Sequence, residues 1–188
     1  MILKVIYSLC DYTGEWCKPY RDNGYDVYQI DLKYGQDARL LEIPPYPVYG
    51  IVAAPDCNAF AGSGAQYWPD KDADGRTLAG LELVAACCRF ILATQPHFWA
   101  IENPIGRLNK WLGEPTMRFN PCDYGDPYTK KTNLWGVFNI PVKNQVEPEK
   151  VCSQGSWVQT LGGSSERTKT LRSSTPPGFA QAFYEAKK

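Results

Sequence analysis

Two short apolar segments constrain the fold of this chain more than any other feature, because each leads into a side chain capable of covalent or acid–base chemistry. The first, residues 50–54, precedes Cys57, and the second, residues 98–101, precedes Glu102. Short continuous apolar runs are typical of strands that are buried on both faces of a parallel sheet. Ligands bind outside the carboxyl ends of such strands. We therefore expect Cys57 and Glu102 to lie together at one end of the sheet.

The N-terminal segment predicts the opening elements of a parallel α/β sheet. Residues 3–9 read as a buried strand, residues 14–23 as a turn and a helix that ends at Asn23-Gly24, and residues 27–30 as a second strand. Asp31 follows Gly14 by 17 residues, close to the roughly 20 that separate a glycine turn from a ribose-binding acid. These features predict a Rossmann-like, mostly parallel sheet flanked by helices.

Cys57 and Glu102 also form a chemically sensible pair. A thiol that attacks a heteroaromatic ring needs an acid at a ring nitrogen, because the electrons pushed into the ring must be accepted there. The lone histidine, His97, precedes the Glu102 strand at its amino end and is read as structural. Seven cysteines without any Cys-x-x-Cys pair suggest neither a disulfide framework nor a metal site.

Four features in this order resemble the DNA cytosine-5 methyltransferases, especially their short, often phage-encoded relatives: the turn 11–14, Asp31, the segment 55–57 and the pair 102–103. The resemblance covers most of residues 1–104. It implies a class I methyltransferase fold in which Cys57 adds to C6 of cytosine, Glu102 contacts N3, and C5 takes the methyl group of S-adenosylmethionine. The positions that match the cofactor site of the family are Tyr12, Thr13, Gly14, Asp31, Asp37 and Pro55.

Three positions depart from the family pattern. Asp56 replaces the second proline of Pro-Pro-Cys, Trp16 stands where a second glycine is usual, and Pro104 follows Glu-Asn. A carboxylate next to a thiol raises the pKa of the thiol by like-charge repulsion, unless it points away or is paired. We therefore expect Asp56 to work against formation of the Cys57 thiolate.

Beyond Pro104 the resemblance is patchy. Residues 128–132, which lead into a predicted strand at 133–138, look like the basic motif that contacts the flipped cytosine and its phosphate, with lysines in place of arginines. Adjacent residues on a strand point to opposite faces, so only one of Lys130 and Lys131 is expected to face the site. Asn103 and Arg167 complete the expected substrate-binding set.

The remaining segments complete a single predicted domain. Residues 67–76 read as a charged loop, which in the family closes over the substrate and here is equally consistent with an acidic surface loop. Residues 78–92 read as a long crossover helix, 139–173 as a linker or a loop wrapped across a substrate, and 174–186 as an amphipathic helix that covers a face of the sheet. The family resemblance implies that this last helix completes the cofactor pocket. The predicted division is a core at 1–104, a reduced substrate-contacting region at 105–173 and a C-terminal helix at 174–188.

Charge is distributed unevenly although the chain is neutral overall. Residues 1–103 carry 8 Lys and Arg against 13 Asp and Glu, whereas residues 104–188 carry 12 against 7. Phosphate binding depends on a local basic face. The second half of the chain could supply such a face, or its basic residues could simply form a solvated surface. These residues are Arg107, Lys110, Arg118, Lys130, Lys131, Arg167, Lys169 and Arg172.

In full-length cytosine-5 methyltransferases, the family that this chain resembles, a large sequence-reading domain lies between the basic motif and the last helix. Here only about forty residues fill that interval. The expected partner is therefore DNA with little sequence readout, single-stranded or mismatched DNA, a free cytosine nucleotide, or DNA read with the help of a protein partner. Transfer of a non-methyl group and a non-catalytic binding role stay open as alternatives. No apolar run reaches the ~18 residues of a membrane span, and the start has no signal-peptide pattern, so we expect a soluble cytoplasmic protein.

Overall fold

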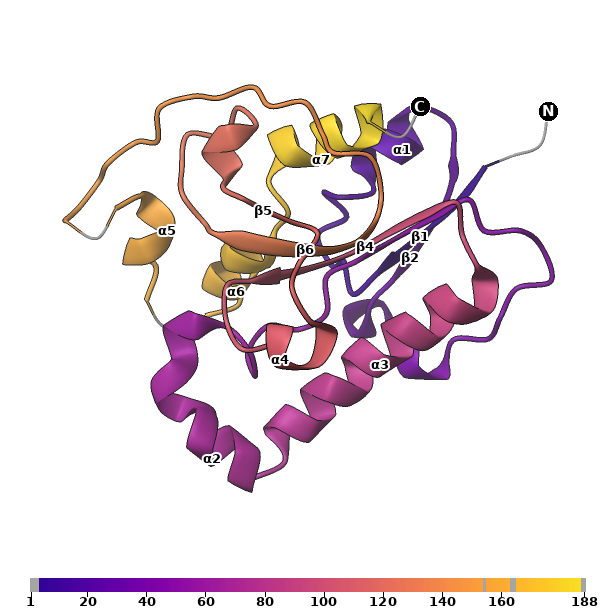
Figure 1. Cartoon of the computed structure of the whole chain (residues 1–188), viewed down its shortest axis with the longest axis horizontal. Coiled ribbons are helices and arrows are strands. Elements are labelled where there is room, and N and C mark those ends of the chain that lie inside the picture. Colours follow the sequence, from indigo (N-terminus) through magenta and orange to yellow (C-terminus); the bar gives the residue numbers. More distant parts are fainter. Residues whose placement is uncertain (1–3, 154, 163–164, 187–188) are drawn as a thin grey trace.

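The computed structural model describes residues 4–153, 155–162 and 165–186, and within them one six-stranded sheet runs through the molecule (Figure 1). The strand order is β2-β1-β3-β4-β6-β5, in which β1 to β4 are parallel and β6 is antiparallel to both of its neighbours. The predicted Rossmann-like α/β fold is confirmed. The strands are β1 (Val5–Leu9), β2 (Asp26–Ile30), β3 (Gly50–Ala53), β4 (Phe98–Pro104), β5 (Met117–Phe119) and β6 (Thr132–Val137).

Helices cover both faces of the sheet. Figure 1 shows α3 on one face and α1 and α7 on the other. Leu3, included in the predicted first strand, lies outside the described residues. The helices are α1 (Lys18–Asp22), α2 (Trp68–Ala73), α3 (Arg76–Thr94), α4 (Asn109–Leu112), α5 (Trp157–Thr160), α6 (Glu166–Ser173) and α7 (Pro177–Glu185), with 3₁₀ turns η1 (Leu32–Tyr34), η2 (Ala38–Leu40), η3 (Gly62–Tyr67) and η4 (Pro121–Asp123).

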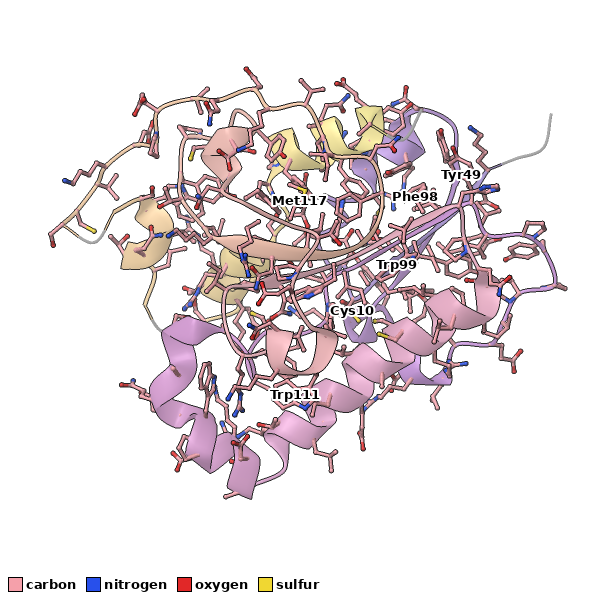
Figure 2. All side chains as sticks on the ribbon, viewed as in Figure 1. Cys10, Tyr49, Phe98, Trp99, Trp111 and Met117 are labelled. Atoms are coloured by element: carbon pink, nitrogen blue, oxygen red, sulfur yellow. The ribbon has the colours of Figure 1, made fainter. Side chains whose placement is uncertain are left out.

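The described residues form three hydrophobic clusters, and the two larger ones lie on opposite faces of the sheet because side chains alternate along each strand. On β3, Ile51 packs in the core that contains Phe90 of α3, whereas Val52 packs in the core that contains Phe179 of α7. Figure 2 shows the same alternation on β4, where Phe98 and Trp99 lie on opposite sides of the sheet. Burial on both faces explains why these strands read as continuous apolar runs.

Trp16 has a structural reason to stand where a second glycine was expected. It is fully buried, with ring centroids 6.0 Å from Phe179 and 5.6 Å from Phe183 of α7. The indole thus joins the segment before α1 to the C-terminal helix. A glycine here would leave a cavity under α7, and cavities of this size destabilise a core strongly.

The sequence-based reading of residues 67–76 as a loop is wrong, because α2 occupies most of it. Pro69 lies in the first turn of α2, where proline is favoured, and Asp70 is suited to the helix N-terminus. Within residues 139–173 the helices α5 and α6 were not anticipated either. Neither contains a buried residue, so neither leaves an apolar periodicity that a sequence analysis can detect.

Helix α3 corrects another expectation, that no segment is long and apolar enough to cross a membrane. Its 19 residues meet that test by length and composition, although core helices of soluble proteins meet it too. In the structure α3 packs on the sheet through Cys87, Phe90 and Ile91.

Arg107 ties together the segments that follow β3 and β4. Its guanidinium is 6 % exposed; Nε donates to the Ala59 carbonyl at 2.9 Å, Nη1 to the Asp72 carboxylate at 2.9 Å, and Nη2 to Thr77 Oγ1 at 2.6 Å. The ring of Trp68 lies 4.9 Å from the guanidinium carbon. One side chain therefore fixes the chain after Cys57 and the starts of α2 and α3.

We predict that Arg107→Ala lowers the free energy of unfolding by about 3 kcal/mol, since it removes a buried charge together with its partners' hydrogen bonds. Urea unfolding followed by circular dichroism measures the change. Arg118→Ala is the matched control, because Arg118 makes only an exposed pair with Glu114 and such pairs contribute little. Equal effects of the two substitutions would contradict the role assigned to Arg107.

Candidate active site

Cys57 and Glu102 lie at the carboxyl ends of two neighbouring parallel strands. The register pairs Ala53 of β3 with Ile101 of β4, so the segment that leads to Cys57 leaves the sheet beside Glu102. Asn103 fixes this arrangement: it is fully buried and its Nδ2 donates to the Pro55 carbonyl at 2.9 Å. The charge of Glu102 is close enough to Cys57 to raise the pKa of the thiol. The structure thus brings the two residues together.

Burial dominates the protonation of both groups. Glu102 is 8 % exposed, and burial raises the pKa of its carboxyl, against the lowering effect of Lys130. Burial also raises the pKa of Cys57 to about 11, with further increases from Asp56 and Glu102. Asp56 acts in the expected direction, while its carboxylate accepts hydrogen bonds from the backbone and side chain of Asn58. Burial therefore favours the protonated form of both groups, and the thiol is mostly protonated at neutral pH.

Two cations partly offset these effects. Lys130 and Arg172 lower the pKa of Cys57. Lys131, the neighbour of Lys130, lines a separate cavity. Both lysines precede β6, so the strand alternation used in the sequence analysis does not apply to them. Arg167 is exposed on α6 and takes no part in this cluster.

A compact polar turn follows β1. The carboxylate of Asp11 accepts hydrogen bonds from the Gly14 amide at 3.0 Å, from Ser8 Oγ at 2.8 Å and from Thr13 Oγ1 at 3.4 Å. Gly14 has φ +70°, a conformation that favours glycine. Tyr12 is exposed at the rim of the turn, and Lys33 Nζ lies 4.1 Å from the centre of its ring.

The two acids assigned to the cofactor differ in their availability. Asp31 is partly exposed at the end of β2, and among the residues that the structure describes its carboxylate accepts one hydrogen bond, at Oδ1 from the Lys33 amide at 2.9 Å. Asp37 accepts three side-chain hydrogen bonds from Arg39, which hold the pKa of its carboxyl below the usual value. Pro55 is buried and its carbonyl is taken by Asn103. Asp31 therefore has the carboxylate better placed to meet a ligand.

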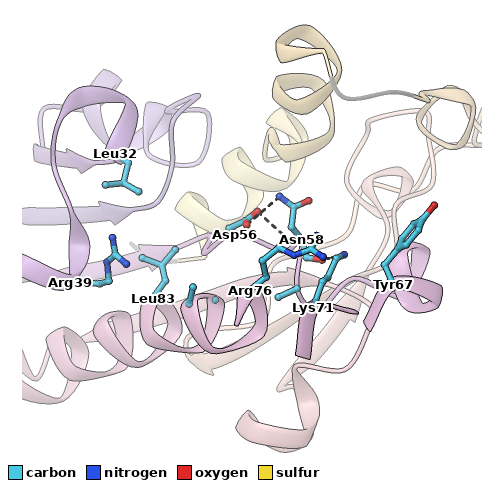
Figure 3. Close-up of a pocket in the computed structure, with 11 residues that line it drawn as sticks. Leu32, Arg39, Asp56, Asn58, Tyr67, Lys71, Arg76 and Leu83 are labelled. Atoms are coloured by element: carbon cyan, nitrogen blue, oxygen red, sulfur yellow. Dashed lines mark hydrogen bonds between the residues drawn. The ribbon is translucent and has the colours of Figure 1, made fainter. Parts of the chain in front are cut away.

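A cavity of about 630 Å³ extends from the end of β2 to the helical segment after Cys57 (Figure 3). Its size is typical of small-molecule sites. Leu32 and Leu83 give it apolar walls, and Asp56 and Asn58 flank Cys57 in the chain. The full lining is Leu32, Arg39, Asp56, Asn58, Ala59, Tyr67, Lys71, Arg76, Ala79, Gly80 and Leu83.

Sequence analysis did not anticipate the roles of three residues, Asp11, Lys33 and Arg172. Asp11 directly follows the first strand, so its position was detectable as a carboxylate at a strand end. Lys33 pairs with Glu166 of α6 at 2.9 Å, and Arg172 acts on Cys57 from the same helix. These two roles depend on how a distant segment returns to the core, for which the sequence contains no local signal.

Comparisons with known proteins support the fold. No protein-family model matches the chain, and no curated protein matches it. A solved structure from E. coli, described as a "putative DNA modification methyltransferase encoded within prophage", is similar over 87 % of this chain with 17 % identity and a TM-score of 0.50. This chain spans 56 % of the length of that structure. At this identity the likeness shows a shared methyltransferase-like α/β fold.

Because the pKa of Cys57 is about 11, its alkylation by iodoacetamide should keep accelerating above pH 9. Asp56→Asn should accelerate the reaction at pH 8, because it removes a negative charge that raises the pKa of Cys57. Lys130→Ala should slow the reaction, because it removes a positive charge that lowers this pKa. Each tenfold change in thiolate should change the rate by about threefold, because a less basic thiolate is also less nucleophilic. Mass analysis of the Cys57 peptide separates it from the other six cysteines.

Asp70→Asn is the control for Asp56→Asn, because it removes the same negative charge at a different place, in α2. It should leave the rate of alkylation unchanged. An Asp56→Asn protein that reacts at the unchanged rate would show that Asp56 does not act on the thiol.

Proposed function

We propose that this protein transfers a methyl group to C5 of cytosine in DNA, with Cys57 as the nucleophile and Glu102 as the acid at N3. The observation that carries the proposal is the juxtaposition of a thiol and a buried carboxyl of raised pKa at the ends of adjacent parallel strands. The fold, shared with a structure described as a DNA modification methyltransferase, supports the same reading.

Two features of the structure fit S-adenosylmethionine as the donor. Asp31 offers a partly exposed carboxylate at the end of β2, the place where ribose hydroxyls are bound in this class of sheet. The cavity beside it has apolar walls at Leu32 and Leu83 that suit an adenine ring. The Gly14 turn would face the amino-acid end. When bound, the donor would supply a methyl group activated by a positively charged sulfur.

In the proposed mechanism the Cys57 thiol loses its proton to solvent, the thiolate sulfur forms a bond to C6 of cytosine, and Glu102 gives its proton to N3. The π electron pair of the C5–C6 double bond becomes available at C5, which is the atom that gains the new substituent. Water then takes the C5 proton, the electron pair of that C–H bond re-forms the C5–C6 double bond, and the Cys57 sulfur leaves as the thiolate. N3 returns its proton to Glu102, and the thiolate regains a proton from solvent. Burial of Glu102 suits this cycle because it favours the protonated carboxyl, which is the form that donates to N3.

A related reaction on a free cytosine nucleotide is the second candidate. It is favoured by the short interval between β6 and α7, which has little surface for reading a duplex. The sulfur and carboxyl chemistry is the same for both substrates. Turnover on single-stranded DNA, mismatched duplex, matched duplex and dCMP, compared at equal protein concentration, separates them.

Substitution of the pair tests the mechanism. Cys57→Ala should abolish transfer and leave donor binding intact, because the thiol acts on the base alone. Glu102→Gln should lower turnover by at least about 100-fold, since an amide cannot deliver a proton. Mass analysis of nucleosides from treated DNA measures both. Full activity of Cys57→Ala would exclude the covalent mechanism.

The Glu102 variant has a second expected readout. A carboxyl whose pKa is raised on folding stabilises the protein below its unfolded pKa, and this contribution is lost as pH rises through the folded pKa. Glu102→Gln should therefore make the protein more stable than the parent at pH 8 and not at pH 4. A stability loss at pH 8 would indicate a structural role for Glu102.

Donor binding is tested with the demethylated product, S-adenosylhomocysteine. Saturation at ~100 times the Kd should add about 2.7 kcal/mol to the free energy of unfolding, measured as a shift in Tm. Asp31→Ala should remove most of this shift, and Asp37→Ala should keep it, because Arg39 already occupies the Asp37 carboxylate. No shift in the parent, together with flat calorimetry, would remove the donor from the proposal.

A further inference from the structure

A second cavity, of about 450 Å³, lies close to the proposed machinery and shares no lining residue with the cavity of Figure 3. Ile105 follows Glu102 by three positions, and Lys131 is next to Lys130. The loop after Cys57 contributes as well. The cavity is lined by Gly62, Ser63, Ile105, Asn120, Thr129, Lys131 and Gln159.

Backbone hydrogen bonds hold the floor of this cavity in place. The Gly62 amide donates to the Ile105 carbonyl at 2.8 Å, and the Ile105 amide donates to the Lys131 carbonyl at 3.1 Å. The segments after Cys57, after Glu102 and around Lys130 are therefore joined edge to edge. A ligand in the cavity would meet a surface that is rigidly connected to the Cys57–Glu102 pair.

The outer wall comes from α5. Gln159 Nε2 donates to the Thr129 carbonyl at 2.8 Å, and the Thr129 amide donates to Ser156 Oγ at 2.9 Å. The rings of Tyr128 and Trp157 pack at 5.0 Å. Because α5 has no buried residue, these contacts with residues 128–129 are what place Gln159 at the cavity.

The lining has the chemistry of a nucleotide site. Five of its seven residues have polar side chains, one of which is a lysine, and none is acidic. Lys131 is exposed and suits a phosphate as a point charge. The Gln159 amide nitrogen already donates to Thr129, which leaves its Oε1 as the acceptor. That oxygen, the amide of Asn120 and the hydroxyl of Ser63 are groups of the kind that read the edge of an unpaired base.

We propose that this cavity binds the nucleotide next to the target cytosine on the same strand, with Lys131 at its phosphate and Gln159 on its base. The inference rests on the proposed function, since it requires that the acceptor be part of a DNA strand. It gives the protein a preference for one flanking base without a groove-reading domain. A free cytosine nucleotide has no such neighbour and would leave the cavity unused.

Binding by the Cys57→Ala protein tests the proposal without turnover. Fluorescence anisotropy is measured with single-stranded heptamers that carry one central cytosine and each of the four bases on either side. One flank should discriminate between its best and worst base by at least about fivefold, the lower limit of ~1–3 kcal/mol per base. Gln159→Ala should reduce this ratio to within about twofold of unity, and Gln145→Ala, an exposed glutamine on the 139–151 segment, should keep it.

Lys131→Ala should weaken binding to all heptamers alike and reduce the slope of log affinity against log salt by about 0.7. Lys143→Ala is the matched control and should keep the slope. Equal affinity for all flanking bases would overturn the proposal. So would a best-to-worst affinity ratio that is unchanged in both Gln159→Ala and Ser63→Ala, provided that these proteins melt like the parent. A flank preference without any methyl transfer would leave the cavity assignment standing and reject the proposed function.

Discussion

The buried guanidinium of Arg107 is the interaction on which the catalytic end of the sheet depends. Parallel strands end at the same side of a sheet, but the loops that follow them are free to diverge. Here Arg107, three residues beyond the end of β4, binds the Ala59 carbonyl two residues beyond Cys57 and also Asp72 of α2. Asn103 adds its bond to Pro55 on the other side of Cys57. Cys57 is thus held between two fixed points, one on the Glu102 strand and one just beyond its end.

The same enclosure creates an electrostatic conflict. Burial raises the pKa of Glu102, which favours its protonated form, and raises the pKa of Cys57, which disfavours the thiolate. Lys130 lowers the pKa of both groups, so it favours the Cys57 thiolate and opposes protonation of Glu102. Arg172 acts on the thiol and is absent from the influences on Glu102. Arg172, a cation of α6, therefore favours the Cys57 thiolate without favouring deprotonation of Glu102.

The sequence predicted the elements whose burial leaves a periodic or continuous apolar pattern: β1 to β4, α3 and α7. It also placed Cys57 and Glu102 at one end of the sheet, because the carboxyl ends of parallel strands converge. It failed for α2, α5 and α6, which are exposed helices held by a few polar contacts such as Ser156–Thr129 and Lys33–Glu166. Contacts of this kind depend on tertiary proximity, and no local pattern encodes them.

These unpredicted helices border the side of the site where substrate would enter, and this has a consequence for recognition. A helix with no buried residue gains its position from a few hydrogen bonds and ion pairs, so it cannot provide the rigid platform that major-groove readout requires. The floor formed by residues 62, 105 and 131 is by contrast joined to the sheet through backbone bonds. Under the proposed function, discrimination between substrates is therefore expected within a short distance of Cys57, at one or two nucleotides, and the exposed cations of α6 are expected to supply affinity that is independent of sequence.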